Sequence, residues 1–142
     1  MKIALKEAKK AWIKQEVPVG AVLVKDDKII AQAHNCSISY NDPTAHAEVL
    51  VLRRGAKKLN NYRLNGTSLY VTLEPCPLCV GAMIHARVER LIFGAYDPKG
   101  GAAGSLIDLT DGKKFNHKIK VTGGILEEEC KSLIQAFFSN KR

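Results

Sequence analysis

The pattern of apolar and polar positions along the chain predicts alternating helices and strands. Stretches with apolar side chains at helical spacing and charged residues between them fit amphipathic helices. Shorter stretches that are rich in β-branched residues and bounded by turn residues fit strands. The predicted helices cover residues 2–15, 42–59, 76–85 and 126–138. The predicted strands cover residues 17–24, 29–33, 68–73 and 90–95, with a short fifth strand at 118–122.

Turn residues between these elements indicate how they connect. The polar run Lys25–Lys28 makes the first two strands a hairpin, and residues 97–104 form a glycine-rich loop. Asp42 followed by Pro43 is typical of a helix start, with a capping side chain and then proline at the first helical position. Strands and helices that alternate after a hairpin predict a single α/β domain over residues 1–142, with helices on both faces of the sheet.

Composition sets limits on this domain and on its partners. The chain has 142 residues, of which 46% are hydrophobic and 25% charged, enough for one packed core. The formal net charge of +8 suits a polyanion such as RNA. A lysine-rich soluble surface without any anionic partner explains the charge equally well.

Cysteine usage and hydropathy indicate the compartment. Four cysteines are present, and two of them form a C-x-x-C pair that a bound metal explains better than a disulfide. The first residues carry charges at Lys6, Glu7 and Lys9, so a signal peptide is not expected. No apolar run approaches the ~20 residues that span a bilayer. We therefore expect a cytoplasmic protein without a membrane partner.

Two short motifs carry the chemistry of the chain. His46-Ala47-Glu48 is an H-x-E motif, and residues 75–79 form P-C-x-x-C with Cys76 and Cys79. One imidazole and two thiolates give a zinc ion three protein ligands, which leaves its fourth position open for water, as in catalytic sites. The remaining carboxylate, Glu48, is then free to move protons. The ordered pair of motifs is the signature of zinc-dependent nucleobase deaminases.

The predicted helix boundaries leave two questions open. If a helix begins at Pro43, His46 lies in its first turn, and Glu48 does not share its face. How Glu48 reaches a metal-bound water is then undetermined. The cysteine pair also fits a purely structural zinc site, which needs a fourth ligand; Cys36 and His85 are the available residues.

Beyond the zinc motif, the chain resembles the bacterial tRNA-specific adenosine deaminases, which convert the wobble adenosine of a tRNA anticodon to inosine. The similarity extends over essentially the whole chain. The matching segments are residues 16–24, 42–48, 61–64, 69–76, 81–85, 93–95 and 101–105. The zinc motif alone is shared with cytidine and guanine deaminases, whereas the other segments favour the tRNA enzyme.

The resemblance implies a three-layer α/β/α cytidine-deaminase-like fold with a mixed central sheet of about five strands. It implies one Zn²⁺ per subunit, a tRNA anticodon stem-loop as partner, a homodimer and no organic cofactor. It further implies roles for particular residues. These are zinc ligands at His46, Cys76 and Cys79, a proton shuttle at Glu48, and substrate contacts at Asn35, the Ala47 main-chain N–H, Asp97 and Lys99.

The resemblance also covers residues outside the zinc motifs and the substrate contacts. Phe138, Lys141 and Arg142, in and after the last helix, are placed to meet the RNA stem. Asn116 and His117 match as well, and a role in stabilising their own loop is equally plausible. Tyr96 and Gly100 depart from the residues common in the substrate loop, which bears on RNA affinity rather than on catalysis.

Two other functions fit parts of this pattern. A deaminase of a free base or nucleoside, such as guanine or cytidine, would use the same zinc and glutamate chemistry. A zinc-stabilised RNA-binding module without catalysis would use the zinc alone. The basic charge and the Gly101–Ser105 segment favour RNA over a free base. The module, unlike the enzymes, would not depend on Glu48.

Overall fold

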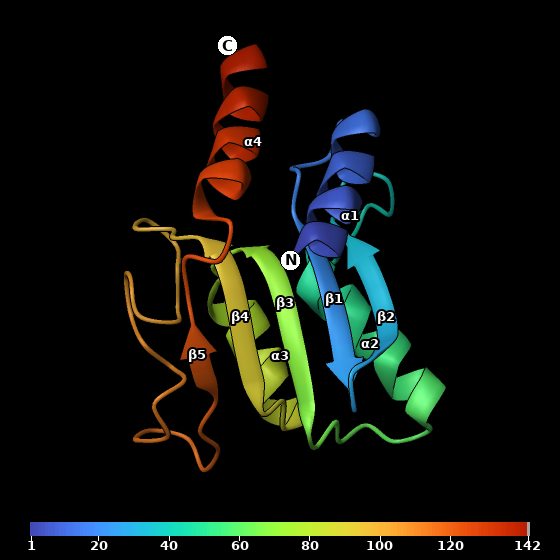
Figure 1. The fold of residues 1–142 in the computed structure, drawn as a ribbon, viewed down its shortest axis with the longest axis vertical. Helices are drawn as coiled ribbons and strands as arrows, with labels where there is room; N and C mark the ends of the chain where they lie inside the picture. The colour runs from blue at the N-terminus through green and yellow to red at the C-terminus, as the bar shows by residue number, and fades with distance from the viewer. Residues whose placement is uncertain (142) are drawn as a thin grey trace.

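Five strands form one mixed sheet in the computed structural model, which describes residues 1–141 (Figure 1). The spatial order is β2-β1-β3-β4-β5. Strand β1 pairs antiparallel with both β2 and β3, whereas β3, β4 and β5 run parallel. The bounds are β1 Gly20–Lys25, β2 Lys28–His34, β3 Thr67–Leu73, β4 Arg90–Ala95 and β5 Lys120–Thr122. The predicted mixed five-stranded sheet is confirmed.

Helices cover both faces of this sheet. In Figure 1, α2 and α3 lie behind it, while α1 lies in front of β1 and α4 rises from the upper end of β4. Their bounds are α1 Lys2–Ile13, α2 Ala47–Leu59, α3 Pro77–Ala86 and α4 Glu127–Asn140. The expected three-layer α/β/α arrangement is therefore confirmed.

The core lies between the sheet and the helix pair α2–α3. Alternate strand residues such as Leu69, Val71 and Leu91 are fully buried, and they belong to the same cluster as Val51 of α2 and Met83 of α3. This follows from the period-two alternation of side chains along a strand. Burial of such side chains, each contributing about 1.5–3 kcal/mol, holds α2 and α3 against the strands that lead to them.

The start of α2 differs from the prediction. The helix begins at Ala47, not at Pro43. The Asp42 carboxylate accepts hydrogen bonds from the main-chain N–H and the hydroxyl of Thr44, at 2.8 and 2.7 Å, and so forms a local turn instead of capping the helix. His46 consequently lies before the helix, in an extended conformation (φ −74°, ψ 149°).

The other boundaries lie within three residues of the prediction. β1 begins at Gly20 rather than Val17, since Pro18 has no N–H to donate to a strand ladder. Within residues 1–141, no helix has both the length and the apolar composition to cross a bilayer.

Candidate metal and catalytic site

The two motifs meet where α2 and α3 begin. His46 is the residue immediately before α2, and Cys76 is the residue immediately before α3, while Cys79 lies in the first turn of α3. Pro77 occupies the first position of α3, where its missing N–H costs nothing. Both helix N-termini, which carry partial positive charge, therefore lie beside the same cluster and favour thiolate there.

The three side chains have the spacing of zinc ligands. His46 Nδ1 lies 3.6 Å from Cys76 Sγ and 3.3 Å from Cys79 Sγ, and the two sulfurs are 3.8 Å apart. Tetrahedral zinc with ordinary bond lengths requires about 3.8 Å between two sulfurs and about 3.5 Å between sulfur and nitrogen. The residues present therefore fit a zinc ion.

The arrangement does not support a four-ligand structural zinc site. Among residues 1–141, His46, Cys76 and Cys79 are the one group of His, Cys, Asp or Glu side chains close enough to share an ion. Cys36 contacts His34 instead, with its Sγ 3.6 Å from Nδ1. His85 is exposed and lines a separate groove on α2 and α3. An ion held by three ligands keeps a position for water.

Glu48 lies beside this cluster, in the first turn of α2, with only 5% of its surface exposed. Because His46 precedes the helix, the two residues are not constrained to opposite helix faces. Both line the same cavity. Burial raises the pKa of Glu48 to about 7.

The electrostatics of the ligands favour deprotonated sulfur at one position. Hydrogen bonding with Cys79, aided by His46, lowers the pKa of Cys76 to about 4. The same pairing, together with burial, raises the pKa of Cys79. The pKa of His46 is raised by its hydrogen bond with Cys76. The pair therefore favours one thiolate beside one thiol, an arrangement that attracts a cation.

A cavity of about 290 Å³ opens over the cluster. It is near the lower end of the size range of small-molecule sites. It brings together Asn35, His46, Glu48, Cys76 and Asp97, all of which belong to the predicted site. Its remaining lining residues are Val17, Val19, Ser37, Leu73 and Glu74. The largely apolar wall with a few converging polar groups suits a flat heterocycle.

Ala47 and Lys99, both expected to contact the substrate, do not line this cavity. The Ala47 main-chain N–H donates to Asn35 Oδ1 at 2.8 Å, and Ala47 is fully buried. Asn35 itself lines the cavity. Lys99 is exposed in the loop after β4, outside the cavity that Asp97 lines.

Phe138 and Lys141, which were expected to meet the RNA stem, do not line the cavity. Phe138 is exposed and lines a second groove with Asp97, and Lys141 Nζ lies 5.0 Å from the centre of the Phe137 ring. Arg142 lies outside the described residues.

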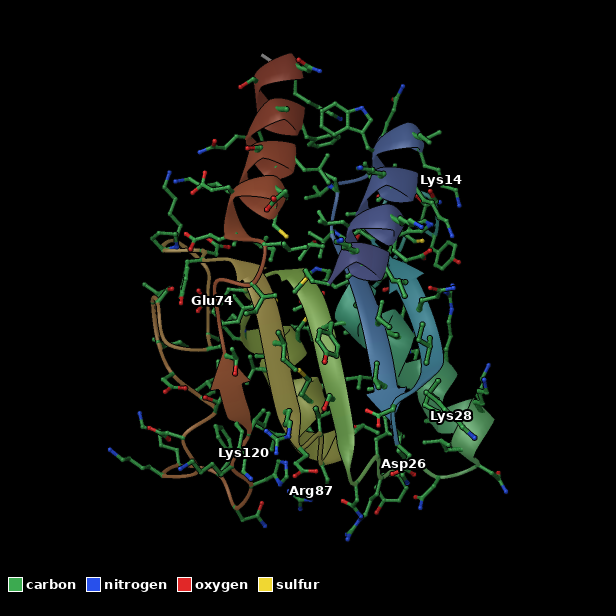
Figure 2. The ribbon with its side chains drawn as sticks, viewed as in Figure 1. Lys14, Asp26, Lys28, Glu74, Arg87 and Lys120 are labelled. Atoms are coloured by element: carbon green, nitrogen blue, oxygen red, sulfur yellow. The ribbon has the colours of Figure 1, made fainter. Side chains whose placement is uncertain are left out.

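Glu74 has a role that sequence reasoning missed. Its carboxylate, 2% exposed, accepts main-chain N–H bonds from Asp97, Ala103 and Ser105 at 3.0, 3.1 and 3.0 Å. It also pairs with the Ser105 hydroxyl. Figure 2 shows it at the upper end of the sheet, beside the glycine-rich loop. Glu74 thus fixes Asp97 relative to Cys76, two residues farther along the chain.

One sequence signal pointed toward this role. A glutamate follows a predicted strand immediately before a metal motif, and the chain also contains a glycine-rich segment at residues 100–105. Gly101 fits there because a Cβ would lie 2.3 Å from Glu74 Cδ.

Comparisons with known proteins agree with this geometry. Residues 1–142 match the family described as MafB19-like deaminase. A tRNA-specific adenosine deaminase of Bacillus subtilis is 53% identical over all of this chain and 88% of its own. A solved structure from a study of A-to-I editing by tRNA:A34 deaminases is 44% identical, covers 94% of this chain and 96% of that one, and superposes with a TM-score of 0.91. A guanine deaminase structure from Bacillus subtilis is 32% identical, with coverage of 97% and 90% and a TM-score of 0.66.

Proposed function

Because the chain belongs to the family of tRNA-specific adenosine deaminases, we propose that its cavity binds the wobble adenosine of a tRNA anticodon and hydrolyses it to inosine. The observation that carries this proposal is the cavity itself, which joins a three-residue metal site to a buried glutamate. Residues 1–142 would act as one deaminase domain.

The metal is zinc in this proposal, held by His46, Cys76 and Cys79. Their separations and the mixed nitrogen and sulfur donors match what zinc requires. Held by these three residues, a zinc ion would supply an activated water molecule at neutral pH. The chain's four cysteines are all free thiols, which fits a reducing cytoplasm.

Glu48 moves the protons of the reaction. It accepts a proton as water attacks the ring carbon that bears the amine, and delivers a proton to the adjacent ring nitrogen. It then carries the second water proton to the amine, which leaves as ammonia while a carbonyl remains. Its burial favours this role, because a carboxyl group with a pKa near 7 gains and loses protons with similar ease.

Asn35 and Asp97 position the base. One lone pair of the Asn35 Oδ1 accepts the hydrogen bond from the Ala47 N–H. The amide N–H groups of Asn35 and the second lone pair remain available to the base. The side chain is thereby fixed in orientation, and a direct base contact from the Ala47 N–H would require this bond to break. Asp97 lines the same cavity and is held through Glu74. Lys99 then serves the RNA strand rather than the base.

A homodimer is supported by the outer face of α2 and α3. An apolar groove of about 300 Å³ runs there, lined by Val49, Leu52, Ala56, Ala82 and Ala86 with Arg53, Tyr62 and His85 at its rim. Tyr62 is 70% exposed. A second copy of the chain would cover this face by a two-fold axis, the commonest arrangement of soluble oligomers.

Inosine formation tests the function. Zinc-loaded protein is incubated with an arginine tRNA transcript that carries adenosine at the wobble position, and separately with adenosine, cytidine and guanine. We expect inosine at that position and no ammonia from the free compounds. If guanine released ammonia while the tRNA stayed unchanged, the zinc and Glu48 mechanism would stand but the substrate would be a free base. The similarity to a guanine deaminase structure makes guanine the relevant free base to test.

A further inference from the structure

A basic pocket lies at the end of the sheet opposite the catalytic cavity. Its volume is about 250 Å³, and Arg87, His117, Lys118 and Lys120 line it together with Glu89, Asn65 and Gly66. Figure 2 shows Arg87 and Lys120 at the lower end of the strands and Glu74 at the upper end. β3 alone, with its seven residues, separates the two ends by about 20 Å.

Several contacts fix this pocket in shape. The Arg87 guanidinium donates to Asn116 Oδ1 at 3.3 Å and to the Ile84 carbonyl at the end of α3 at 3.4 Å. His117 Nε2 lies 2.7 Å from the Val88 carbonyl oxygen, which anchors the loop against β4. Asn116 and His117 therefore stabilise their loop, and by doing so they hold the Arg87 cation at the pocket.

The lining of the pocket has more cationic than anionic side chains. Within residues 1–141, the ion pairs are Lys10–Glu7 and Arg53–Asp42, both remote from this pocket. Glu89 is the one carboxylate that lines it, against Arg87, Lys118 and Lys120. Lysine and arginine side chains that gather with too few carboxylates to neutralise them attract anions, phosphate among them.

The adjoining loop extends the same chemistry. Lys113 and Lys114 precede Phe115, which is 44% exposed. Arg90 lies beside Lys120 in the register of β4 and β5. Proteins that bind single-stranded nucleic acid combine aromatic and cationic side chains in this way. The bases stack on the aromatic ring, and the phosphates contact the cations.

We propose that this basic pocket binds backbone phosphates of the substrate tRNA outside its anticodon stem-loop. The inference rests on the proposed function for the identity of the RNA. The separation of the two ends exceeds a Debye length of about 8 Å at physiological salt, so the cations act by direct binding and not through a field at the cavity. The pocket would then select whole tRNA over its isolated hairpin.

The test compares two RNAs with two double variants. Lys118→Ala/Lys120→Ala removes two cations of the pocket, and Lys6→Ala/Lys9→Ala removes two exposed cations from α1 as a matched control. Dissociation constants for the full tRNA transcript and for the anticodon hairpin are measured by fluorescence anisotropy between about 50 and 200 mM salt. Inosine formation in the hairpin is followed in parallel.

We expect Lys118→Ala/Lys120→Ala to weaken binding of the full transcript by roughly fivefold to eightfold for each phosphate that is no longer neutralised, at about 0.1 M salt. The log–log salt slope should become shallower by about 0.7–0.9 for each such phosphate. Hairpin binding and hairpin turnover should stay at the wild-type level, as should all properties of the α1 control.

Equal weakening of both RNAs, or no change in either, would overturn the proposal. Failure of the wild-type protein to form inosine would instead count against the proposed function. The binding comparison would still decide whether the pocket recognises the body of the tRNA.

Discussion

At the residue scale, the proposed mechanism depends on the Glu48 carboxyl group, which lies beside the three metal-binding side chains. Glu48→Gln preserves volume and burial but removes the proton shuttle, so we expect inosine formation to fall by at least about 100-fold. Metal content should remain at one ion per chain, since Glu48 is not among the three ligands. Quenched-flow turnover and elemental analysis check the two halves of this expectation.

A matched control for this change exists on α1. Glu7 is also 5% exposed and pairs with Lys10 far from the cavity, so Glu7→Gln should alter stability without altering turnover. Undiminished turnover of Glu48→Gln would remove Glu48 from the mechanism.

Glu74 acts on the same cavity through the loop it holds. Glu74→Gln replaces one acceptor oxygen with an N–H₂ group that faces N–H donors, leaving donors unpaired at a cost of about 1–3 kcal/mol each. We expect a lower melting temperature and a raised KM, because Asp97 loses its anchor. Gly101→Ala should act in the same direction, since its Cβ would collide with the carboxylate. Unchanged KM in both variants would contradict a positioning role.

Glu16 gives the stability of the chain a dependence on pH. Burial alone would raise the pKa of Glu16, but hydrogen bonds from Ser39 and Ile38, with nearby His34, outweigh it and lower the pKa. A lowered folded-state pKa stabilises the protein above the unfolded value of about 4.3, and the contribution is lost as pH falls through the folded value. Urea unfolding from pH 6 to 3 should therefore show a smaller acid-induced loss in Glu16→Gln than in the wild type. Parallel curves for the two proteins would exclude this contribution.

These residue roles differ in how far the sequence reveals them. His46, Glu48, Cys76 and Cys79 are readable because their chemistry requires those residue types at fixed short spacing. The contacts of Glu74 join positions 23 to 31 residues apart, and only the folded sheet brings those positions together.

At the element scale, periodicity located every helix and strand, while competing local signals obscured one boundary. Asp42 and Pro43 are as suitable for a turn as for a helix start, and local residue preferences do not decide which of the two forms. The boundary affects the site, because a helix that begins at Ala47 leaves His46 outside α2. His46 and Glu48 can then line one cavity.

The docking of α1 depends on one glycine in β1. A Cβ on Gly20 would lie 2.0 Å from the Ala4 carbonyl oxygen and 2.5 Å from the Ala8 nitrogen, so Gly20→Ala must push α1 away from the sheet. We expect destabilisation of about 3 kcal/mol or more, by analogy with overpacked cores. Gly81→Ala, within α3, meets nothing within 4 Å and should stabilise by about 0.5–1 kcal/mol. Chemical denaturation of both variants checks this contrast, and similar stabilities would refute it.

At the scale of the whole molecule, the apolar groove on α2 and α3 predicts the assembly state. Ala82→Arg introduces a charge into that groove, so we expect this variant to sediment as a monomer of 15.6 kDa. Ile13→Arg, at an 80% exposed position of α1, should leave the dimer intact. Sedimentation equilibrium distinguishes the two, and a wild-type protein that sediments at 15.6 kDa would rule out the dimer.

The parallel pairing of β3 with β4 has a consequence for the order in which the molecule forms. Parallel strands need a crossover connection between them, here through α3, and such non-local pairing is slow. His46 and Cys76, 30 residues apart, likewise meet only through tertiary structure, so we expect a metal ion to bind a chain that has already folded. It should retard unfolding without hastening folding. Protein prepared without the metal should then be folded but inactive, and it should gain activity when the ion is added.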